Sequence, residues 1–480
     1  MHKFDLMIPG ASSASKPVTV LAPWNREPIG TVATADAAAC EHALTTAYAL
    51  FRNREGWLPR PKHIEILEKA QALMRERAES LAVEAAREGG KPLPDSRVEI
   101  ARAIDSLKLC VETLRTEAGE VIPMGVTASS ANRIAFTQLE PIGVVVAISA
   151  FNHPVNLIAH QVGPAIAAGC PVIVKPARTT PLSCMRLVGI LREAGLPPEW
   201  CQPLLPENNE LSSKLAADPR VAFLSFIGSA KVGWGLRSKL AQGARCALEH
   251  GGVAPVIVAA DADLDQAVPL LAKGGFYHAG QVCVSVQRVY AARAIADDLA
   301  HRLAAAGQKM KVGDPTLVDT DVGPLIDPTE VDRIEAWVGE ALAGGAELLS
   351  GGKRLSDTTY APTVLLNPPP EAKVSTQEVF GPVVCVYAFD ALDDALQRAN
   401  ALPFAFQAAV FTRSIDTALR CSERLDASAV MVNDHTAFRV DWMPFAGLRH
   451  SGYGVGGIPH TMHDMQVRKM TVIKSAEIRR

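Results

Sequence analysis

The pattern of apolar and polar positions divides the chain into two kinds of segment. Residues 35–85 are rich in alanine, and their apolar positions recur with helical spacing, so the pattern predicts helices there. The segment GGKPLPDS ends this run, and a further helix is predicted from Arg97 to Arg115. The first 25 residues follow neither a helical nor an alternating pattern, and we expect them to be extended.

From residue 141 onward, short apolar runs of strand length alternate with helical stretches. The predicted strands are 144–149, 171–176, 201–205, 222–228 and 245–252, and the predicted helices are 159–169, 180–195, 212–218 and 231–242. Strands that are joined by helices form a parallel, doubly wound sheet, so the pattern predicts an α/β fold. A second α/β series begins near residue 254, which predicts a domain boundary near Gly251–Gly252. Residues 119–140 and 464–474 are predicted to form strands outside both sheets.

Size and composition agree with a soluble protein of two or three domains. The chain has 480 residues, of which 48% are hydrophobic and 21% charged. The net charge of -3 gives no overall positive excess for binding nucleic acid or an anionic membrane, so we expect neither as a partner. The longest apolar runs, such as GVVVAI, are too short to span a membrane.

The cysteines point to a reduced environment. The nine cysteines are separated from one another, and none has a second cysteine or a histidine at the spacing of a zinc site, so we predict no metal. The N-terminal residues lack the apolar core of a signal peptide. An odd number of cysteines without such a signal predicts free thiols and a cytoplasmic protein.

Two segments carry residues suited to a dinucleotide. FIGSAKVG places Gly228, Ser229 and Gly233 at a strand-to-helix turn, where backbone N–H groups bind a pyrophosphate. The segment is not Gly-x-Gly-x-x-Gly, and a purely structural turn explains it equally well. Lys175 ends a predicted strand, where it either bonds ribose hydroxyls or is a solvated lysine.

Three further residues are candidates for catalysis. Glu249 follows a strand and precedes two glycines, where it is either a general base or a capping carboxylate. Asn152 follows another strand, where its amide either stabilises an oxyanion or forms an ordinary turn. Cys283, in GQVC, is either a nucleophile or a buried small apolar residue.

Together these segments resemble the aldehyde dehydrogenase family, and the resemblance extends over nearly the whole chain. The matching motifs, in the family's order, are FNHP, VKPA, FIGSAKVG, LEHGG, GQVC, EVFGPV and MPFAGLRHSGYG, preceded by the family-like EGGKPLPDSRVE. Seven ordered motifs do not coincide by chance. The resemblance implies a Rossmann-like cofactor domain (residues 1–118 and 141–251), an α/β catalytic domain (252–460), and strands that build homodimers or homotetramers (119–140 and 461–480).

The resemblance also implies a mechanism. Cys283 attacks a small aldehyde, while Asn152 and the backbone N–H of Cys283 hold the oxyanion. A hydride passes to NAD or NADP, and water activated by Glu249 hydrolyses the remaining thioester to a carboxylic acid. The residues expected to contact the cofactor are Lys175, Arg178, Gly228, Ser229, Gly233, Glu378 and Phe380.

Three positions depart from the family's usual pattern. His250 stands where the family usually has leucine, and it either tunes Glu249 or packs. Arg178 stands where NAD-preferring members often have glutamate, and it either pairs with the 2′-phosphate of NADP or is solvated. His153 stands in place of an aromatic residue beside the aldehyde and makes that pocket more polar.

The substrate pocket implied by the resemblance favours a short polar or anionic aldehyde, such as a semialdehyde or hydroxyaldehyde. Its expected residues are Arg102, Ala103, His153, Asn156, His160, Tyr277, Val282, Val284, Phe438 and Arg439. Arg439 either supplies a second positive charge or braces its loop against Asp441. The alternatives are oxidation of benzaldehyde-type substrates, a CoA-acylating enzyme, a thiol hydrolase using Cys283 and His278, and a non-catalytic scaffold.

Overall fold

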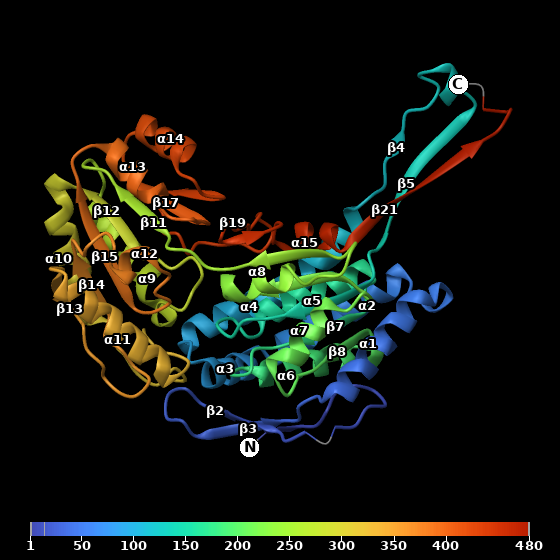
Figure 1. The fold of residues 1–480 in the computed structure, drawn as a ribbon, viewed down its shortest axis with the longest axis horizontal. Coiled ribbons are helices and arrows are strands. Elements are labelled where there is room, and N and C mark those ends of the chain that lie inside the picture. The colour runs from blue at the N-terminus through green and yellow to red at the C-terminus, as the bar shows by residue number, and fades with distance from the viewer. Residues whose placement is uncertain (1, 14, 479–480) are drawn as a thin grey trace.

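Two large β-sheets lie side by side, and a narrow three-stranded sheet projects away from them (Figure 1). The computed structural model describes residues 2–13 and 15–478. The α/β fold class predicted from the sequence is confirmed, because helices alternate with parallel strands in both large sheets. Within the described residues, every helix is too short or too polar to cross a lipid bilayer.

The first large sheet has six strands, and its neighbouring strands are parallel except at one edge. Their order is β20 (Gly452–Tyr453), β10 (Arg245–Glu249), β9 (Val221–Ile227), β6 (Val144–Ile148), β7 (Val172–Lys175) and β8 (Cys201–Pro203). The five strands predicted between residues 144 and 252 are confirmed. The edge strand β20 runs antiparallel to β10 and was not predicted.

Helices bury both faces of this sheet, which explains its continuous apolar strands. Val145 and Ala147 of β6 belong to the core on one face, whereas Val144 and Val146 belong to the core on the other. The first core includes residues of α2 (Arg60–Glu76), α3 (Ala78–Gly89), α4 (Leu93–Thr116), α5 (Asn156–Ala168), α6 (Pro181–Glu193) and α15 (Ile458–Asp464). The second includes residues of α1 (Ala37–Arg52), α7 (Asn209–Ala217) and α8 (Ala230–Arg237).

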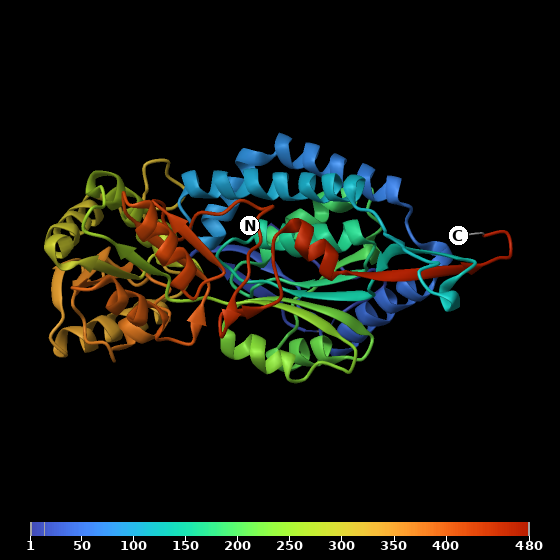
Figure 2. The same cartoon turned by 90° about the horizontal axis from the view of Figure 1, so that it is seen from above.

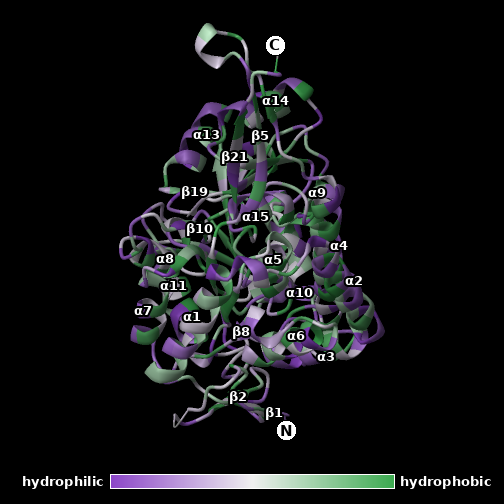
Figure 3. Ribbon diagram, turned by 90° about the vertical axis from the view of Figure 1, so that its right-hand side faces the viewer, coloured by the Kyte–Doolittle hydropathy of each residue, from purple (hydrophilic) through white to green (hydrophobic). Residues whose placement is uncertain are grey.

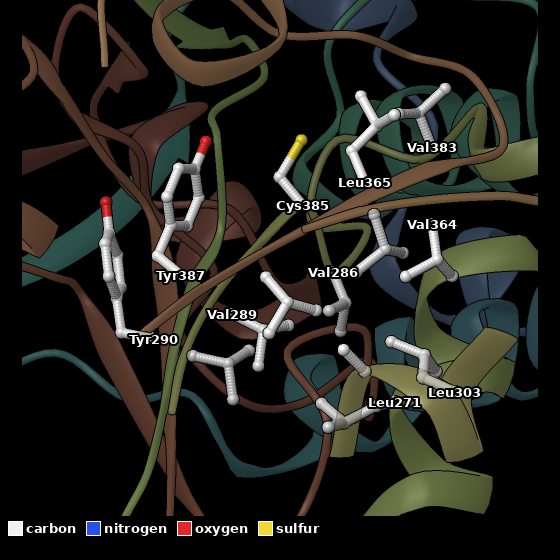
Figure 4. Close-up of a cluster of buried hydrophobic side chains, with 14 of the residues drawn as sticks. Leu271, Val286, Val289, Tyr290, Leu303, Val364, Leu365, Val383, Cys385 and Tyr387 are labelled. Atoms are coloured by element: carbon white, nitrogen blue, oxygen red, sulfur yellow. The ribbon is translucent and has the colours of Figure 1, made fainter. Parts of the chain in front are cut away.

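The second large sheet has seven strands and its own core. Their order is β13 (Glu347–Ser350), β14 (Thr363–Leu366), β15 (Val383–Phe389), β12 (Arg288–Ala292), β11 (Pro255–Val258), β17 (Gln407–Phe411) and β18 (Ala429–Val432). Its helices are α9 (Leu264–Phe276), α10 (Arg293–Lys309), α11 (Pro328–Ala343), α12 (Lys373–Thr376), α13 (Leu392–Asn400) and α14 (Ile415–Arg424). Figure 4 shows part of this core, where Tyr290 and Tyr387 stack at a centroid distance of 5.2 Å.

The C-terminal part of the chain returns from the second sheet to the first. β16 (Phe404–Ala405) pairs with β19 (Leu448–Arg449). The next strand, β20, pairs with the end of β10, opposite Leu248 and Glu249. This return brings Arg439, Gly452 and Gly456 beside Glu249. β20 lies within the range 252–460 that we assigned to the second domain, and the predicted domain boundaries stay a prediction.

The three-stranded sheet forms an arm at the end of the molecule opposite the seven-stranded sheet (Figure 2). It consists of β21 (Gln466–Lys474), β5 (Arg133–Pro141) and β4 (Val121–Ile122), so the strands predicted outside both large sheets are confirmed, although residues 123–132 between them contain no strand. The N-terminal residues form a small sheet of β1 (His2–Phe4), β3 (Pro28–Val32) and β2 (Val18–Leu21), which the sequence pattern did not predict. Figure 3 shows that outer helices such as α2 carry both hydrophilic and hydrophobic residues along their length.

Candidate active site

The turn that carries Cys283 has an unusual backbone. His278, Ala279 and Gly280 follow one another with φ angles of 51°, 53° and 70°. Such left-handed conformations cost about 1 kcal/mol or more for each residue with a side chain. A Cβ atom at Gly280 would lie 2.1 Å from the carbonyl oxygen of Gly381, so this position requires glycine. The surrounding structure therefore maintains this strained turn, and the turn sets the direction in which the chain enters Cys283.

The side chain of Gln281 holds this turn in place. Its Nε2 donates to the carbonyl oxygens of His278 (3.2 Å) and Pro324 (3.1 Å), and its Oε1 accepts from the N–H of Ile326 (2.9 Å). The glutamine is buried, so these bonds have no competition from solvent. This explains why a glutamine precedes the cysteine by two positions.

Replacing Gln281 with leucine should lower both stability and kcat. The change leaves the partners of three buried hydrogen bonds unsatisfied, each at a cost of about 1–3 kcal/mol, and releases the strained turn. We expect a lower midpoint of thermal unfolding and a kcat at least about tenfold lower, because small displacements of a nucleophile have large effects. Gln281→Glu keeps the acceptor for Ile326 but turns a second acceptor toward the carbonyl oxygens of His278 and Pro324, so it should be impaired as well. A leucine variant with unchanged kcat would show that the turn does not position Cys283.

Asn152 lies against the same turn. Its Nδ2 donates to the carbonyl oxygen of Gln281 at 2.9 Å, and its side chain is buried. An amide nitrogen has two hydrogens, so one remains for another acceptor. Gln281 is two residues before Cys283, so this contact places the amide near the candidate nucleophile, which the predicted oxyanion role requires.

Cys283 and Glu249 face each other. The Cys283 Sγ lies 3.8 Å from the Glu249 Oε1, and the thiol donates in this contact. Burial, followed by the charge of Glu249, raises the pKa of Cys283, and Arg439 opposes this shift. Burial also raises the pKa of Glu249. The free enzyme therefore holds a thiol next to a carboxylate that is able to accept its proton.

Arg439 supplies the nearest positive charge to this pair. Its Nη1 lies 3.9 Å from the Glu249 Oε1, and its guanidinium stacks over the Phe445 ring at 3.6 Å. Its Nη2 donates to the Nδ1 of His160 at 3.4 Å, while its Nε is buried without a hydrogen-bond partner. Burial lowers the pKa of Arg439, and the charge of Glu249 opposes this. Arg439 thus remains a cation with an unused donor beside the candidate nucleophile.

Arg102, by contrast, is bound to Asp441. Its Nε and Nη2 donate to the two carboxylate oxygens of Asp441 at 3.1 and 2.6 Å. The Nε2 of His160 donates to the same carboxylate at 2.7 Å. Burial opposes ionisation of Asp441, but the bonds from His160 and Arg102 outweigh it and lower its pKa. Asp441 is therefore braced by Arg102 and His160, and Arg439 is directed at Glu249.

A buried chain of polar groups ends at His153. The Lys91 Nζ donates to the Glu99 Oε2 (2.5 Å) and to the His153 Nδ1 (2.6 Å). The Glu99 Oε1 accepts from the first amides of α5, at Val155 (2.8 Å) and Asn156 (3.0 Å). Burial and then the charge of Lys91 lower the pKa of His153, so its ring is neutral and carries its hydrogen on Nε2.

The other residues predicted to form the pocket divide into three groups. Val282 and Val284 pack with Phe406 and Phe445 in a small apolar cluster that Tyr277 and Cys283 join. Asn156 is buried and accepts from the Ser106 hydroxyl at 3.3 Å, which directs it toward α4. Phe438 is exposed.

His278 does not support the thiol hydrolase. Its ring is buried, and both ring nitrogens lack a hydrogen-bond partner. The ring lies edge-on to His153 and is not paired with Cys283.

The predicted cofactor residues fit a nicotinamide dinucleotide. The Oε1 of Glu378 is buried without a partner, burial raises the pKa of this carboxyl to about 8, and ribose hydroxyls would supply the missing donors. Gly228 and Ser229 stand at the N-terminus of α8, where the first amides have no intrahelical partner. Phe380 lies edge-on to Phe151 at 5.8 Å and offers an aromatic surface.

Two cofactor residues lie at the carboxyl end of β7. Burial, and then the neighbouring charge of Arg178, lower the pKa of Lys175. Arg178 is exposed, and its Nη1 donates to the carbonyl oxygens of Pro206 and Glu207, both at 3.3 Å. The two bonds use only the Nη1 of Arg178, so its other N–H groups remain for a ligand. That Arg178 pairs with the 2′-phosphate of NADP stays a prediction.

Comparison with known proteins decides the family. A model of the aldehyde dehydrogenase family matches residues 10–471. The chain belongs to the aldehyde dehydrogenase family. It is an enzyme of the NAD(P)-dependent type, as the resemblance predicted.

Individual members of this family match over nearly the full length. A 3-sulfolactaldehyde dehydrogenase of Priestia aryabhattai is 36% identical over 474 residues, which cover 98% of each chain. The structure of aldehyde dehydrogenase 21 from Physcomitrella patens, in complex with the reaction product succinate, matches with a TM-score of 0.94 and 33% identity over 99% of each chain. A glyceraldehyde-3-phosphate dehydrogenase from Methanocaldococcus jannaschii, complexed with NADP, matches with a TM-score of 0.91 and 33% identity over 96% of this chain and 100% of that one.

The candidate site of this aldehyde dehydrogenase also contains residues that the sequence pattern did not single out. Lys91 and Glu99 both lie in EGGKPLPDSRVE, and Gln281 lies in GQVC, so their motifs were visible but their contacts were not. Asp441 was considered only as a partner of Arg439. Its true partners, Arg102 and His160, are 339 and 281 positions away along the chain, and no local pattern predicts such pairs.

Proposed function

We propose that this aldehyde dehydrogenase oxidises a short aldehyde that carries an anionic group, such as a semialdehyde or an anionic hydroxyaldehyde. The observation that carries the proposal is Arg439, whose buried guanidinium has an unpartnered Nε and lies 3.9 Å from the general base. A buried cation without a close, fully bonded partner is costly, and an anionic ligand compensates for that cost. Arg439 is therefore the candidate anion-binding residue, whereas the charge of Arg102 is already matched by Asp441.

The related proteins support the same substrate class. The names of the three compared proteins refer to sulfolactaldehyde, succinate and glyceraldehyde 3-phosphate, and each of these molecules carries an anionic group. In this chain, the Nε2–H of His153 adds a donor suited to a hydroxyl substituent. A substrate with both features, an anion and a hydroxyl, would use Arg439 and His153 together.

In the proposed reaction, Glu249 accepts the Cys283 proton as the sulfur attacks the aldehyde carbonyl. The free N–H of Asn152 and the backbone N–H of Cys283 stabilise the resulting oxyanion. The bound dinucleotide supplies the hydride acceptor for the oxidation. Glu249 releases the thiol proton to solvent, which restores its carboxylate, and then takes a proton from the water that attacks the thioester. It returns this proton to the departing Cys283 sulfur, so that the acid and the thiol are released.

The decisive experiment for the substrate class compares Arg439→Gln with the wild type on two aldehydes of equal length. Succinic semialdehyde carries the carboxylate, and butanal lacks it. Loss of a charge-assisted hydrogen bond should raise the KM for succinic semialdehyde by about 30-fold or more. Butanal, which lacks the anion, should lose only the smaller part of kcat/KM that follows from the raised pKa of Cys283 in the variant. Arg439→Lys keeps the charge and should fall between the two. Equal losses on both aldehydes would contradict an anion site.

A labelling experiment tests the same charge without a known substrate. Iodoacetate is anionic and iodoacetamide is neutral, yet both alkylate thiolates. Arg439 should direct iodoacetate to Cys283, so the ratio of the two labelling rates should fall in Arg439→Gln. An unchanged ratio would place the guanidinium too far from the sulfur to bind a substrate anion.

Two alternatives receive less support. A benzaldehyde-type substrate requires an apolar box, but the charges of Arg439 and Arg102 act on Glu249, and Arg439 also acts on Cys283. A CoA-acylating enzyme does not require a water-activating carboxylate, whereas Glu249 lies 3.8 Å from the sulfur. Added CoA should therefore leave the free acid as the product.

We propose that the protein is a homodimer or homotetramer of the cytoplasm. The projecting arm carries exposed apolar residues, which favours its burial against another copy. These residues are Val121, Ile134, Met470, Val472 and Ile473. All nine cysteines are free, as expected in a reducing compartment. Light scattering should give two or four times the chain mass of 51.1 kDa, and a monomeric mass would contradict this assignment.

A further inference from the structure

His250 lies beneath the turn at Gly228 and Ser229, which joins β9 to α8 and is expected to bind the cofactor. It follows Glu249 at the end of β10, and its side chain is buried. Its Nδ1 donates to the carbonyl oxygen of Gly228 at 2.8 Å. The ring lies against Phe226 and Trp234, at centroid distances of 5.7 and 5.9 Å. It therefore joins the end of the catalytic strand to the turn between β9 and α8.

The ring also determines which residue fits in the first turn of α8. A Cβ atom at Gly233 would lie 2.0 Å from the His250 Cε1 and 2.7 Å from its Nε2. Gly233 is thus required by the histidine beneath it. The Nε2 itself is buried without a partner, and burial lowers the pKa of His250, so the ring is neutral with its hydrogen on Nδ1.

Two hydrogen bonds connect Gly228 to the catalytic strand. The Gly228 N–H donates to the carbonyl oxygen of Glu249 at 3.0 Å, and the His250 side chain donates back to the carbonyl oxygen of Gly228. The backbone N–H of His250 donates to the carbonyl oxygen of Ser451 at 3.0 Å, which fixes the histidine from the other side. A leucine at position 250, the usual residue of the family, would leave the Gly228 carbonyl without this donor.

The bond to Gly228 has a geometric consequence for the next amide. A peptide unit is planar, so a fixed Gly228 carbonyl also fixes the direction of the Ser229 N–H. That N–H and the first amides of α8 form the anion-binding end of the helix. We infer that His250 is a positioning residue that holds the Gly228–Ser229 peptide for the diphosphate of the dinucleotide and links this turn to Glu249. The inference does not depend on the identity of the aldehyde.

The test compares His250→Leu with His250→Asn. Asparagine can place an N–H at nearly the position of Nδ1, whereas leucine cannot donate. Calorimetric titration with ADP-ribose, which has the diphosphate but no nicotinamide, measures binding without turnover. Loss of one hydrogen bond should weaken ADP-ribose binding about five- to tenfold in the leucine variant, and the asparagine variant should stay within about threefold of the wild type.

Two further measurements separate positioning from packing. With saturating cofactor, the KM for the aldehyde should be unchanged in His250→Leu, while the KM for the cofactor rises. Hydrogen exchange of the free enzyme should be faster at the Ser229 amide in the leucine variant. If that variant does not fold, His250→Gln, whose donor lies one bond farther out, should bind ADP-ribose more weakly than His250→Asn. Wild-type ADP-ribose binding in the leucine variant, or equal binding by the glutamine and asparagine variants, would overturn the inference.

Discussion

Replacing Cys283 with serine should reduce kcat by at least about 10³-fold, because the hydroxyl is a far weaker nucleophile than a thiolate. Glu249 lies 3.8 Å from the sulfur, and this contact is suited to a thiol proton. A hydroxyl with a much higher pKa does not transfer its proton to the same carboxylate at neutral pH. Absorbance of the reduced cofactor measures the loss, and calorimetry should show that ADP-ribose still binds.

Cys421→Ala provides a control for the loss of a thiol elsewhere. Cys421 is buried in α14, beside the seven-stranded sheet, and takes no part in the candidate site. Its replacement should leave kcat within about twofold of the wild type, apart from a modest loss of stability. Activity above about a tenth of the wild-type kcat in Cys283→Ser would assign the chemistry to another residue.

Replacing Glu249 with glutamine should separate the two halves of the reaction. Attack on the aldehyde should survive the loss of this base, because the neutral glutamine lowers the pKa of Cys283 and increases its thiolate fraction. Hydrolysis of the thioester has no such compensation and should slow by about 10²–10⁴-fold, so the enzyme should release close to one reduced cofactor per site before a slow steady state. Stopped-flow absorbance measures this burst. Glu378→Gln removes another buried carboxyl, which is expected to contact the cofactor, and should raise the cofactor KM without producing a burst. A Glu249→Gln variant with no burst and no slow phase would contradict the assigned role.

In Glu249→Gln, the pH dependence of Cys283 alkylation should also shift. The Glu249 carboxylate contributes to the raised pKa of Cys283, so its neutral replacement should lower that pKa. The rate of Cys283 alkylation by iodoacetamide should therefore rise at lower pH in Glu249→Gln than in the wild type. Arg439 lowers the pKa of the thiol, and Arg439→Gln should shift the same profile to higher pH. Shifts in the same direction would show that these charges do not act on the sulfur as the structure indicates.

Much of the fold was predictable because its signals are local. The strand β6 is buried on both faces, and its continuous apolar sequence follows directly from that environment. The catalytic candidates were visible for a related reason, since Asn152 comes shortly after β6 and Glu249 is the last residue of β10. The short strands of the N-terminal sheet and β20 have two to five residues each, which is too few to show a period.

The ion pairs of the site were not predictable in the same way. Arg102 and Arg439 are both cations near the nucleophile, and the sequence does not indicate which of them Asp441 neutralises. The folded chain pairs Asp441 with Arg102 across 339 positions and leaves Arg439 facing Glu249. Buried charges are costly unless they are paired, so the partner of each one decides which charge remains for a ligand.

Covalent catalysis by Cys283 is tested most directly by the mass of the Glu249→Gln protein after mixing with succinic semialdehyde and, in parallel samples, NAD or NADP. We predict one acyl group per chain, and digestion should locate it on the peptide that contains Cys283. Hydroxylamine should remove the group, because it cleaves thioesters. Reduced cofactor formed without any acyl group on the protein, or an acyl group on a different cysteine, would contradict the account.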